Sequence, residues 1–314
     1  MAQPLRIGID IGGTKVNAGL VGENGEILRK ESFPSAGARQ PAAFVDEVVQ
    51  RVVAMLAAQG ATLKDVTHIG VGIPGTADYT RGVVEYSCNL FGEAEVPLSD
   101  LFATRWGRSV TVVQDSWAAA YAEYRFGSQR AHENMLCLTV GTGIGCGVIS
   151  GGKVFSGAMH TAGEIGHTPI VWQGRPCACG KRGCLERYAS GTAIWEQAME
   201  RFPDKLHDLP PKAESVFVLA YAGDGEALRL IAECVDKLAY GIALMIDILS
   251  TDTVLISGGI CAHKGLFIDP LQEKILGYGY PPWARKRQVR VYQASLGSDA
   301  PMVGAAFLTA ADIV

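Results

Sequence analysis

The chain has 314 residues, of which 48% are hydrophobic and 19% are charged, with a formal net charge of -4. This composition is typical of a folded globular protein, and the length exceeds what one hydrophobic core usually holds, so we expect two domains. The net charge is mildly negative and gives no indication of the basic surface that nucleic-acid binding requires. We therefore predict no nucleic-acid partner.

The N-terminus, MAQPLRIGIDIGG, has no basic and apolar pattern of a secretory signal. The longest apolar run, LAYGIALMIDIL (238–249), contains Asp247 and is shorter than the ~20 residues that span a bilayer. We expect a cytoplasmic protein without a membrane partner, in a compartment that keeps thiols reduced.

A glycine-rich hairpin is predicted at residues 6–21, RIGIDIGGTKVNAGLV, and a similar one at residues 135–150, MLCLTVGTGIGCGVIS. Neither matches the Walker loop or the Rossmann fingerprint. Their backbone N–H groups and the hydroxyls of Thr14 and Thr142 can donate to phosphate oxygens. Asp10, at the start of the first turn, could hold Mg²⁺ directly or through water. The repetition predicts two related α/β domains.

Apolar periodicity predicts further helices and strands between and after these hairpins. Asp115 stands at the carboxyl end of one strand, where open α/β sheets bind ligands. The expected elements, in chain order, are a helix at 41–60, strands at 67–75 and 109–115, and helices at 116–127 and 225–249, then a strand at 253–260, a helix near 263–275, a strand at 288–294 and a helix at 300–311.

Three cysteines, Cys177, Cys179 and Cys184, lie within eight residues, and two glycines interrupt them. Three thiolates need one more ligand to close a tetrahedral zinc site, and His167 is the nearest candidate. Four protein ligands leave no open position, so we expect this zinc to be structural. The alternatives are a chance cluster or a disulfide. The reduced compartment and the odd number of cysteines in the cluster disfavour the disulfide.

Two carboxylates, Glu164 and Glu186, flank the predicted zinc loop. A metal that fixes His167 and Cys184 also fixes the residues beside them, and rigid carboxylates can accept hydrogen bonds from the hydroxyl groups of a polyol. The alternative is that both glutamates are solvated surface residues.

Four short motifs follow one another along the chain. They are Asp10-x-Gly12-x-Thr14, Gly141-Thr142-Gly143, the Gly-His…Cys-x-Cys-Gly-x-x-Gly-Cys-x-Glu signature that ends at Glu186, and Gly258-Gly259. In these motifs the chain resembles the ROK family of repressors and sugar kinases, over nearly its whole length. The resemblance implies an α/β, two-domain actin/hexokinase-like (ribonuclease H-like) fold, with ATP and sugar in a cleft between the domains.

The resemblance also implies roles for single residues. Asp115 would be the catalytic base for the sugar hydroxyl, and His167 would bind both sugar and zinc. Zn²⁺ would be structural, and Mg²⁺ would accompany ATP. The substrate-binding residues would be Gly75, Asn89, Gln114, Glu164, His167 and Glu186. The nucleotide-binding residues would be Asp10, Gly12, Gly13, Thr14, Lys15, Thr142, Gly143, Gly258 and Gly259.

The stretch around Asp115 departs from the family pattern Asn-Asp-Ala-Asn. It reads QDSWAAA, so that Gln114 and Trp117 replace the two asparagines. Glutamine is one methylene longer and tryptophan far bulkier, so we expect a pocket of altered shape. The usual preference for glucose does not follow for this chain.

We predict ATP-dependent phosphorylation of a hexose or hexose derivative at its 6-hydroxyl. The N-terminal domain is expected at 1–117 with the helix 300–314 packed on it, and the larger domain at 118–299, carrying the zinc loop 167–184. The resemblance suggests a homodimer. The alternatives are a sugar-sensing regulator, for which we expect no room before the first strand, and a sugar-binding protein with weakened catalysis.

Overall fold

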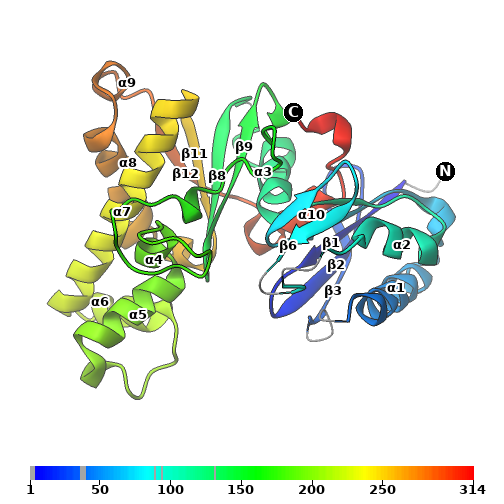
Figure 1. Cartoon of the computed structure of the whole chain (residues 1–314), viewed down its shortest axis with the longest axis horizontal. Coiled ribbons are helices and arrows are strands. Elements are labelled where there is room, and N and C mark those ends of the chain that lie inside the picture. Colours follow the sequence, from blue (N-terminus) through cyan, green and yellow to red (C-terminus); the bar gives the residue numbers. More distant parts are fainter. Residues whose placement is uncertain (1–3, 36–39, 88–89, 93–94, 131) are drawn as a thin grey trace. The chain divides into compact units, whose positions relative to one another are not determined.

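The computed structural model describes residues 4–35, 40–87, 90–92, 95–130 and 132–314 (Figure 1). These residues form two compact units. The first unit contains residues 1–133, 147–162 and 295–314, and the second contains residues 134–146 and 163–294. None of the helices in this described part of the chain is long and apolar enough to cross a membrane.

The first unit is built on a five-stranded sheet with the strand order β3-β2-β1-β4-β7. The strands β3, β2 and β1 pair in antiparallel fashion, whereas β1, β4 and β7 run parallel, so the carboxyl ends of the last three share one edge. Their bounds are β1 Leu5–Ile11, β2 Lys15–Val21, β3 Ile27–Pro34, β4 Val66–Ile73 and β7 Thr111–Gln114.

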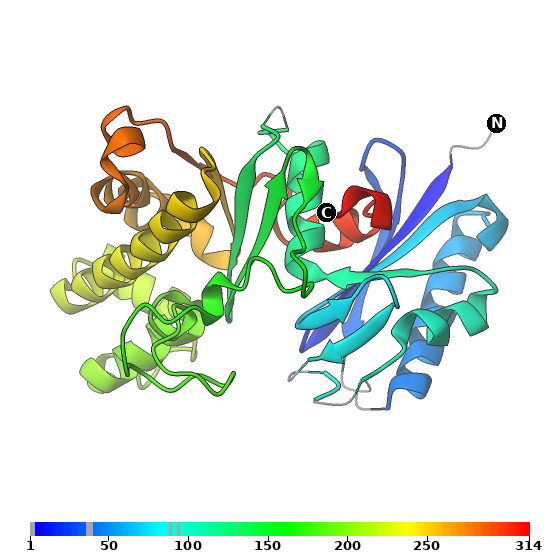
Figure 2. The ribbon, with the colours of Figure 1, turned by 45° about the horizontal axis from the view of Figure 1, so that its top comes forward.

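The two faces of this sheet carry different residues. The large side chains of β1 join a core with α1 (Pro41–Ala58), including Ile9 and Phe44. On the other face stand glycines, and a Cβ at Gly8 or Gly70 would overlap the backbone of α10 (Ala300–Ala305). The glycines therefore let α10 approach the sheet, on the side opposite to α1 (Figure 2).

The first unit also contains two short strands and two further helices. The strands β5 (Thr76–Asp78) and β6 (Val83–Tyr86) form a small antiparallel sheet. The helix α2 (Leu98–Trp106) precedes β7, and α3 (Asp115–Phe126) follows it without an intervening loop residue and packs against α10.

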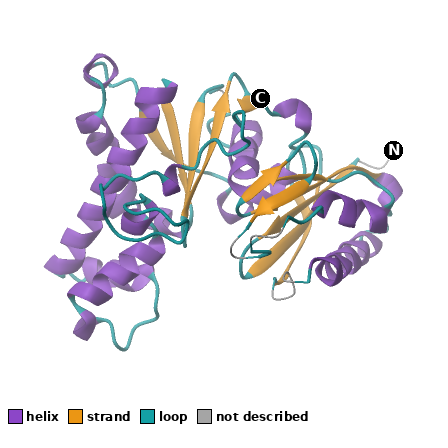
Figure 3. Ribbon diagram, in the orientation of Figure 1, coloured by secondary structure: helices purple, strands orange, loops and turns teal. Residues whose placement is uncertain are grey.

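The second sheet has the order β10-β9-β8-β11-β12, and α7 and α8 lie beside its strands in the second unit (Figure 3). Its strands are β8 Met135–Val140, β9 Ile144–Ser150, β10 Lys153–Val154, β11 Thr253–Ser257 and β12 Arg290–Gln293. The helices of the second unit are α4 Glu186–Ala189, α5 Gly191–Arg201, α6 Ala213–Tyr221, α7 Gly225–Leu249, α8 Lys264–Tyr278 and α9 Pro281–Arg285.

Both predicted hairpins are confirmed, and so is the helix that begins at residue 41. Two elements end well before the predicted residue. The strand predicted at 253–260 ends at Ser257, because Gly258 has φ +109° and starts a 3₁₀ turn at Gly259–His263. The last helix ends at Ala305 and leads into turns.

Candidate active site

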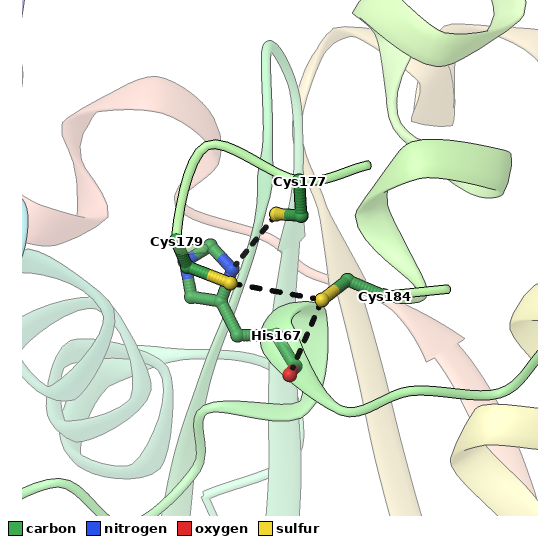
Figure 4. A group of neighbouring side chains, drawn as sticks. All are labelled: His167, Cys177, Cys179 and Cys184. Atoms are coloured by element: carbon green, nitrogen blue, oxygen red, sulfur yellow. Dashed lines mark hydrogen bonds between the residues drawn. The ribbon is translucent and has the colours of Figure 1, made fainter. Parts of the chain in front are cut away.

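A loop of the second unit gathers the three cysteines and His167 (Figure 4). The N–H of Cys177 donates to the carbonyl of Lys181, and the glycines at 180 and 183 have φ of +85° and +83°. A left-handed backbone is cheap only for glycine, so these two residues allow the chain to wrap its thiols around one point.

The four ligand atoms of this cluster lie within 4.8 Å of one another. Nδ1 of His167 is 3.6 Å from the sulfur of Cys177, and the sulfurs of Cys179 and Cys184 are 3.7 Å apart. Zinc–sulfur bonds of about 2.3 Å in a tetrahedron place sulfurs at about this spacing. The donor set and its geometry therefore fit Zn²⁺.

Burial raises the pKa of the Cys177 thiol to about 12 and also raises the pKa of Cys184. Buried thiols stay protonated unless a cation compensates the charge, and zinc deprotonates the thiols that bind it. Cys177 and Cys184 are therefore suited to bind a metal. The pKa of Cys179 is lowered instead, because hydrogen bonds to its sulfur outweigh the effect of its burial.

Glu186 connects this cluster to the second glycine-rich turn. Its Oε1 is 3.4 Å from Nδ1 of His167 and accepts a hydrogen bond from the Cys177 thiol at 3.3 Å. A Cβ added at Gly143 would lie 2.9 Å from Oε2 of the same carboxylate, so this carboxylate lies close to the turn. The predicted sugar-binding and nucleotide-binding residues of this unit therefore meet at Glu186.

A cavity of about 350 Å³ opens beside the same turn. Its wall includes two predicted nucleotide-binding residues, Thr142 and Gly259. Gly258 lies next to the wall without lining it, and a Cβ there would overlap the carbonyl of Val140. The remaining lining residues are Gly141, Gly191, Thr192, Trp195, Pro211, Lys212, Ala213, Glu214 and Ile260.

Sequence reasoning missed the side chains that α5 and α6 bring to this cavity. Trp195 offers an aromatic surface, and Lys212 and Glu214 offer charges. None of them belongs to a glycine-rich turn. The N–H of Gly191 donates to the carbonyl of Gly141 at 2.7 Å, which joins the start of α5 to the turn. The only sequence signal was the amphipathic pattern of these helices.

Glu164 also belongs to the second unit, and the remaining predicted residues belong to the first unit, at the carboxyl edge of its parallel strands. Asp10 on β1 aligns with Gly72 on β4, and Gly72 aligns with Val113 on β7. Asp115 follows two residues later as the first residue of α3, and a Cβ at Gly72 would lie 3.5 Å from its Cα. Two carboxylates thus occupy one edge of the sheet.

Gln114 and Gly75 support this edge. The Gln114 side chain is buried and donates from Nε2 to the carbonyl of Gly75 at 2.8 Å. Gly75 has φ +105°, and a Cβ there would overlap the carbonyl of Tyr86. The third expected residue of this region, Asn89, lies outside the described residues.

The first glycine-rich turn presents exposed groups next to Asp10. Gly12 donates to the carbonyl of Lys15 at 2.8 Å, and Gly13, Thr14 and Lys15 are exposed. Burial raises the pKa of Asp10, opposed by a hydrogen bond from Nδ2 of Asn17 at 3.1 Å. A half-buried carboxylate beside exposed donors suits a cation that accompanies phosphate.

Comparisons with known proteins agree with these motifs. The model of the ROK family matches residues 6–312. The glucokinase of Thermotoga maritima is 34% identical over 96% of this chain and 95% of its own length. The N-acetylmannosamine kinase of Yersinia pseudotuberculosis is 31% identical over 98% of this chain and 99% of its own length.

A solved structure gives the same result for the fold. The ROK family glucokinase of Streptomyces griseus, in complex with glucose and AMPPNP, is 31% identical and has a TM-score of 0.78 over 96% of this chain and 98% of that chain. This protein belongs to the ROK family. The predicted two-domain actin/hexokinase-like fold class is confirmed.

Proposed function

We propose that this protein phosphorylates the 6-hydroxyl of a hexose or hexose derivative, with Asp115 as the general base. The family and its glucokinase and N-acetylmannosamine kinase relatives make the protein an ATP-dependent sugar kinase. The observation that carries the finer proposal is the position of Asp115 after β7, on the edge that Asp10 shares.

Asp115 is suited to align and deprotonate a hydroxyl. It is the first residue of a 12-residue helix, and its Oδ1 accepts a hydrogen bond from the N–H of Ser116 at 2.6 Å. The N-terminus of a helix favours negative charge, which keeps the carboxylate available as a proton acceptor. The attacking oxygen then forms its bond to the γ-phosphorus while ADP leaves.

Six residues are proposed to bind the hexose. Gly75, Asn89 and Gln114 belong to the first unit by sequence, and Glu164, His167 and Glu186 to the second. Nδ1 of His167 faces the thiols, so its Nε2 is the nitrogen that would meet a sugar hydroxyl. The cysteine cluster would hold Zn²⁺ and fix the imidazole in this orientation.

The nucleotide would occupy the cavity at Thr142 and Gly259, supported by Gly143 and Gly258. Trp195 is suited to stack on the nucleobase. The exposed turn from Gly12 to Lys15 would donate to phosphate oxygens, and Asp10 would hold Mg²⁺. Mg²⁺ would neutralise charge that develops on the transferring phosphate.

The predicted domain division at residue 117 and the homodimer also remain proposals. Light scattering coupled to size exclusion tests the dimer, which requires about twice the 33.4 kDa of one chain.

A comparison of hexoses with their 6-deoxy forms tests whether the 6-hydroxyl accepts the phosphate. We expect turnover with at least one member of a panel of glucose, mannose, allose, fructose and N-acetylated hexosamines, and none with its 6-deoxy form. Proton–phosphorus NMR of the product should connect phosphorus to carbon 6. Phosphate on another oxygen would contradict the proposal.

A further inference from the structure

Trp117 occupies the third position of α3, two residues after Asp115, and its side chain is fully buried. Its indole N–H donates to the carbonyl of Ala162 at 3.1 Å. Both residues belong to the first unit. The bulk of this side chain is therefore taken up inside the unit, and its polar edge is used to hold a distant segment of the chain.

Aromatic contacts hold the same segment at a second point. The ring of Tyr79 packs edge-on against Trp117 at 6.3 Å and against His160 at 4.9 Å. His160 has φ +53°, a left-handed conformation that costs a residue with a Cβ free energy. Such a conformation persists only where its surroundings fix it. The segment that ends at Ala162 is thus held at two positions.

This segment leads directly to Glu164. The N–H of Ile165 donates to the carbonyl of Gly163 at 2.6 Å, and the N–H of His167 donates to the carbonyl of Glu164 at 3.1 Å. Glu164 therefore lies two residues after the carbonyl that Trp117 holds and three residues before the histidine of the metal cluster.

We propose that Trp117 is a positioning residue for substrate binding, which fixes Glu164 by holding the carbonyl of Ala162. This inference rests on the proposed function, in which Glu164 binds sugar hydroxyls. The metal cluster fixes one end of the 162–167 stretch and Trp117 fixes the other. Without the contact to Trp117, the Glu164 carboxylate samples more positions. Ordering it on binding then reduces the free energy of sugar binding.

The predicted kinetic signature is a change in KM for the hexose. A hydroxyl contact of Glu164 that does not act on the reacting oxygen is equally strong in the ground state and the transition state, so its loss raises KM and leaves kcat unchanged. Loss of one buried hydrogen bond predicts a rise of roughly five- to tenfold. A purely structural role would instead lower the amount of active enzyme and leave KM unchanged.

The experiment compares Trp117→Phe with Trp106→Phe in the full-length protein. Trp106 is also buried and stacks on Phe102 at 5.0 Å, but its indole N–H makes no hydrogen bond in the described part of the chain. Both variants therefore lose the same ring size, but only Trp117→Phe also loses a hydrogen bond, the one to the carbonyl of Ala162. The readouts are kcat, KM for the hexose, KM for ATP, and hydrogen exchange of the amides of residues 160–165.

We expect Trp117→Phe to raise KM for the hexose, with kcat and KM for ATP within about twofold of wild type, and to speed exchange at 160–165. Trp106→Phe should leave KM and these amides unchanged. An unchanged hexose KM in Trp117→Phe, or an equal rise in both variants, would overturn the inference. Wild-type protein without turnover on any hexose would instead contradict the proposed function, and the inference with it.

Discussion

Asp115 lies where a strand passes directly into a helix, so two regular elements fix its backbone. Replacement by asparagine keeps this geometry and removes the ability to accept a proton. We predict that Asp115→Asn lowers kcat about 10²- to 10⁴-fold with little change in KM for ATP. The matched control is Asp100→Asn on α2, where the residue is exposed. Asp115→Asn with more than half of the wild-type turnover would remove Asp115 from its role.

We predict that the buried charge of Asp10 lowers the stability of the fold, although the same carboxylate supports activity. Burial raises its pKa above the ordinary value of 3.8, so the folded state binds this proton more tightly than the unfolded state. As pH rises through the window between the two pKa values, stability falls, and at neutral pH the full cost is present. Asp10→Asn removes this cost.

We therefore expect Asp10→Asn to raise Tm at pH 7, with a smaller gain near pH 4, and to lower turnover with Mg-ATP because the ligand for the cation is weakened. Thermal melts at both pH values and steady-state kinetics measure the two effects. A lower Tm at pH 7 with wild-type turnover would show that neither the buried charge nor the cation role is correct.

At the scale of elements, the loop from His167 to Cys184 carries the metal site. Cys184→Ser should reduce bound zinc from about one ion per chain, lower Tm, and raise KM for the hexose at least tenfold because His167 and Glu186 lose their support. Elemental analysis and thermal melts give the first two results. Cys261→Ser is the control, since a hydroxyl can keep the hydrogen bond that this thiol donates to the carbonyl of Ile256. Equal zinc in both variants would exclude the cluster as the metal site.

The elements that sequence reasoning recognised are those with strong local signals. Glycine at a turn between two apolar strands predicted both hairpins, and ligand spacing predicted the cluster at His167. Long-range contacts leave no such signal. The cavity wall at Trp195 depends on how α5 and α6 pack, and the hydrogen bond of Trp117 joins residues 45 positions apart. The sequence shows only that Trp117 is large, whereas its full burial and its hydrogen bond to Ala162 follow from the fold.

At the scale of the whole molecule, the chain passes between its two units after residues 133, 146, 162 and 294. One of these passages follows Ala162, which Trp117 holds, and precedes the residues proposed to bind the sugar. The proposed base and phosphate loop belong to one unit, and the zinc loop and nucleotide cavity belong to the other. Neither unit carries the full set of proposed reacting groups, so we expect turnover only when both ATP and the hexose are bound.

The most direct test of this central claim is ADP release by the wild-type protein with Mg-ATP, in the presence and absence of each hexose of the panel. We predict release at about 1–10³ s⁻¹ with at least one hexose and far slower release with ATP alone. Zinc-loaded protein that melts cooperatively yet releases ADP no faster with any hexose than without would contradict the assignment as a sugar kinase.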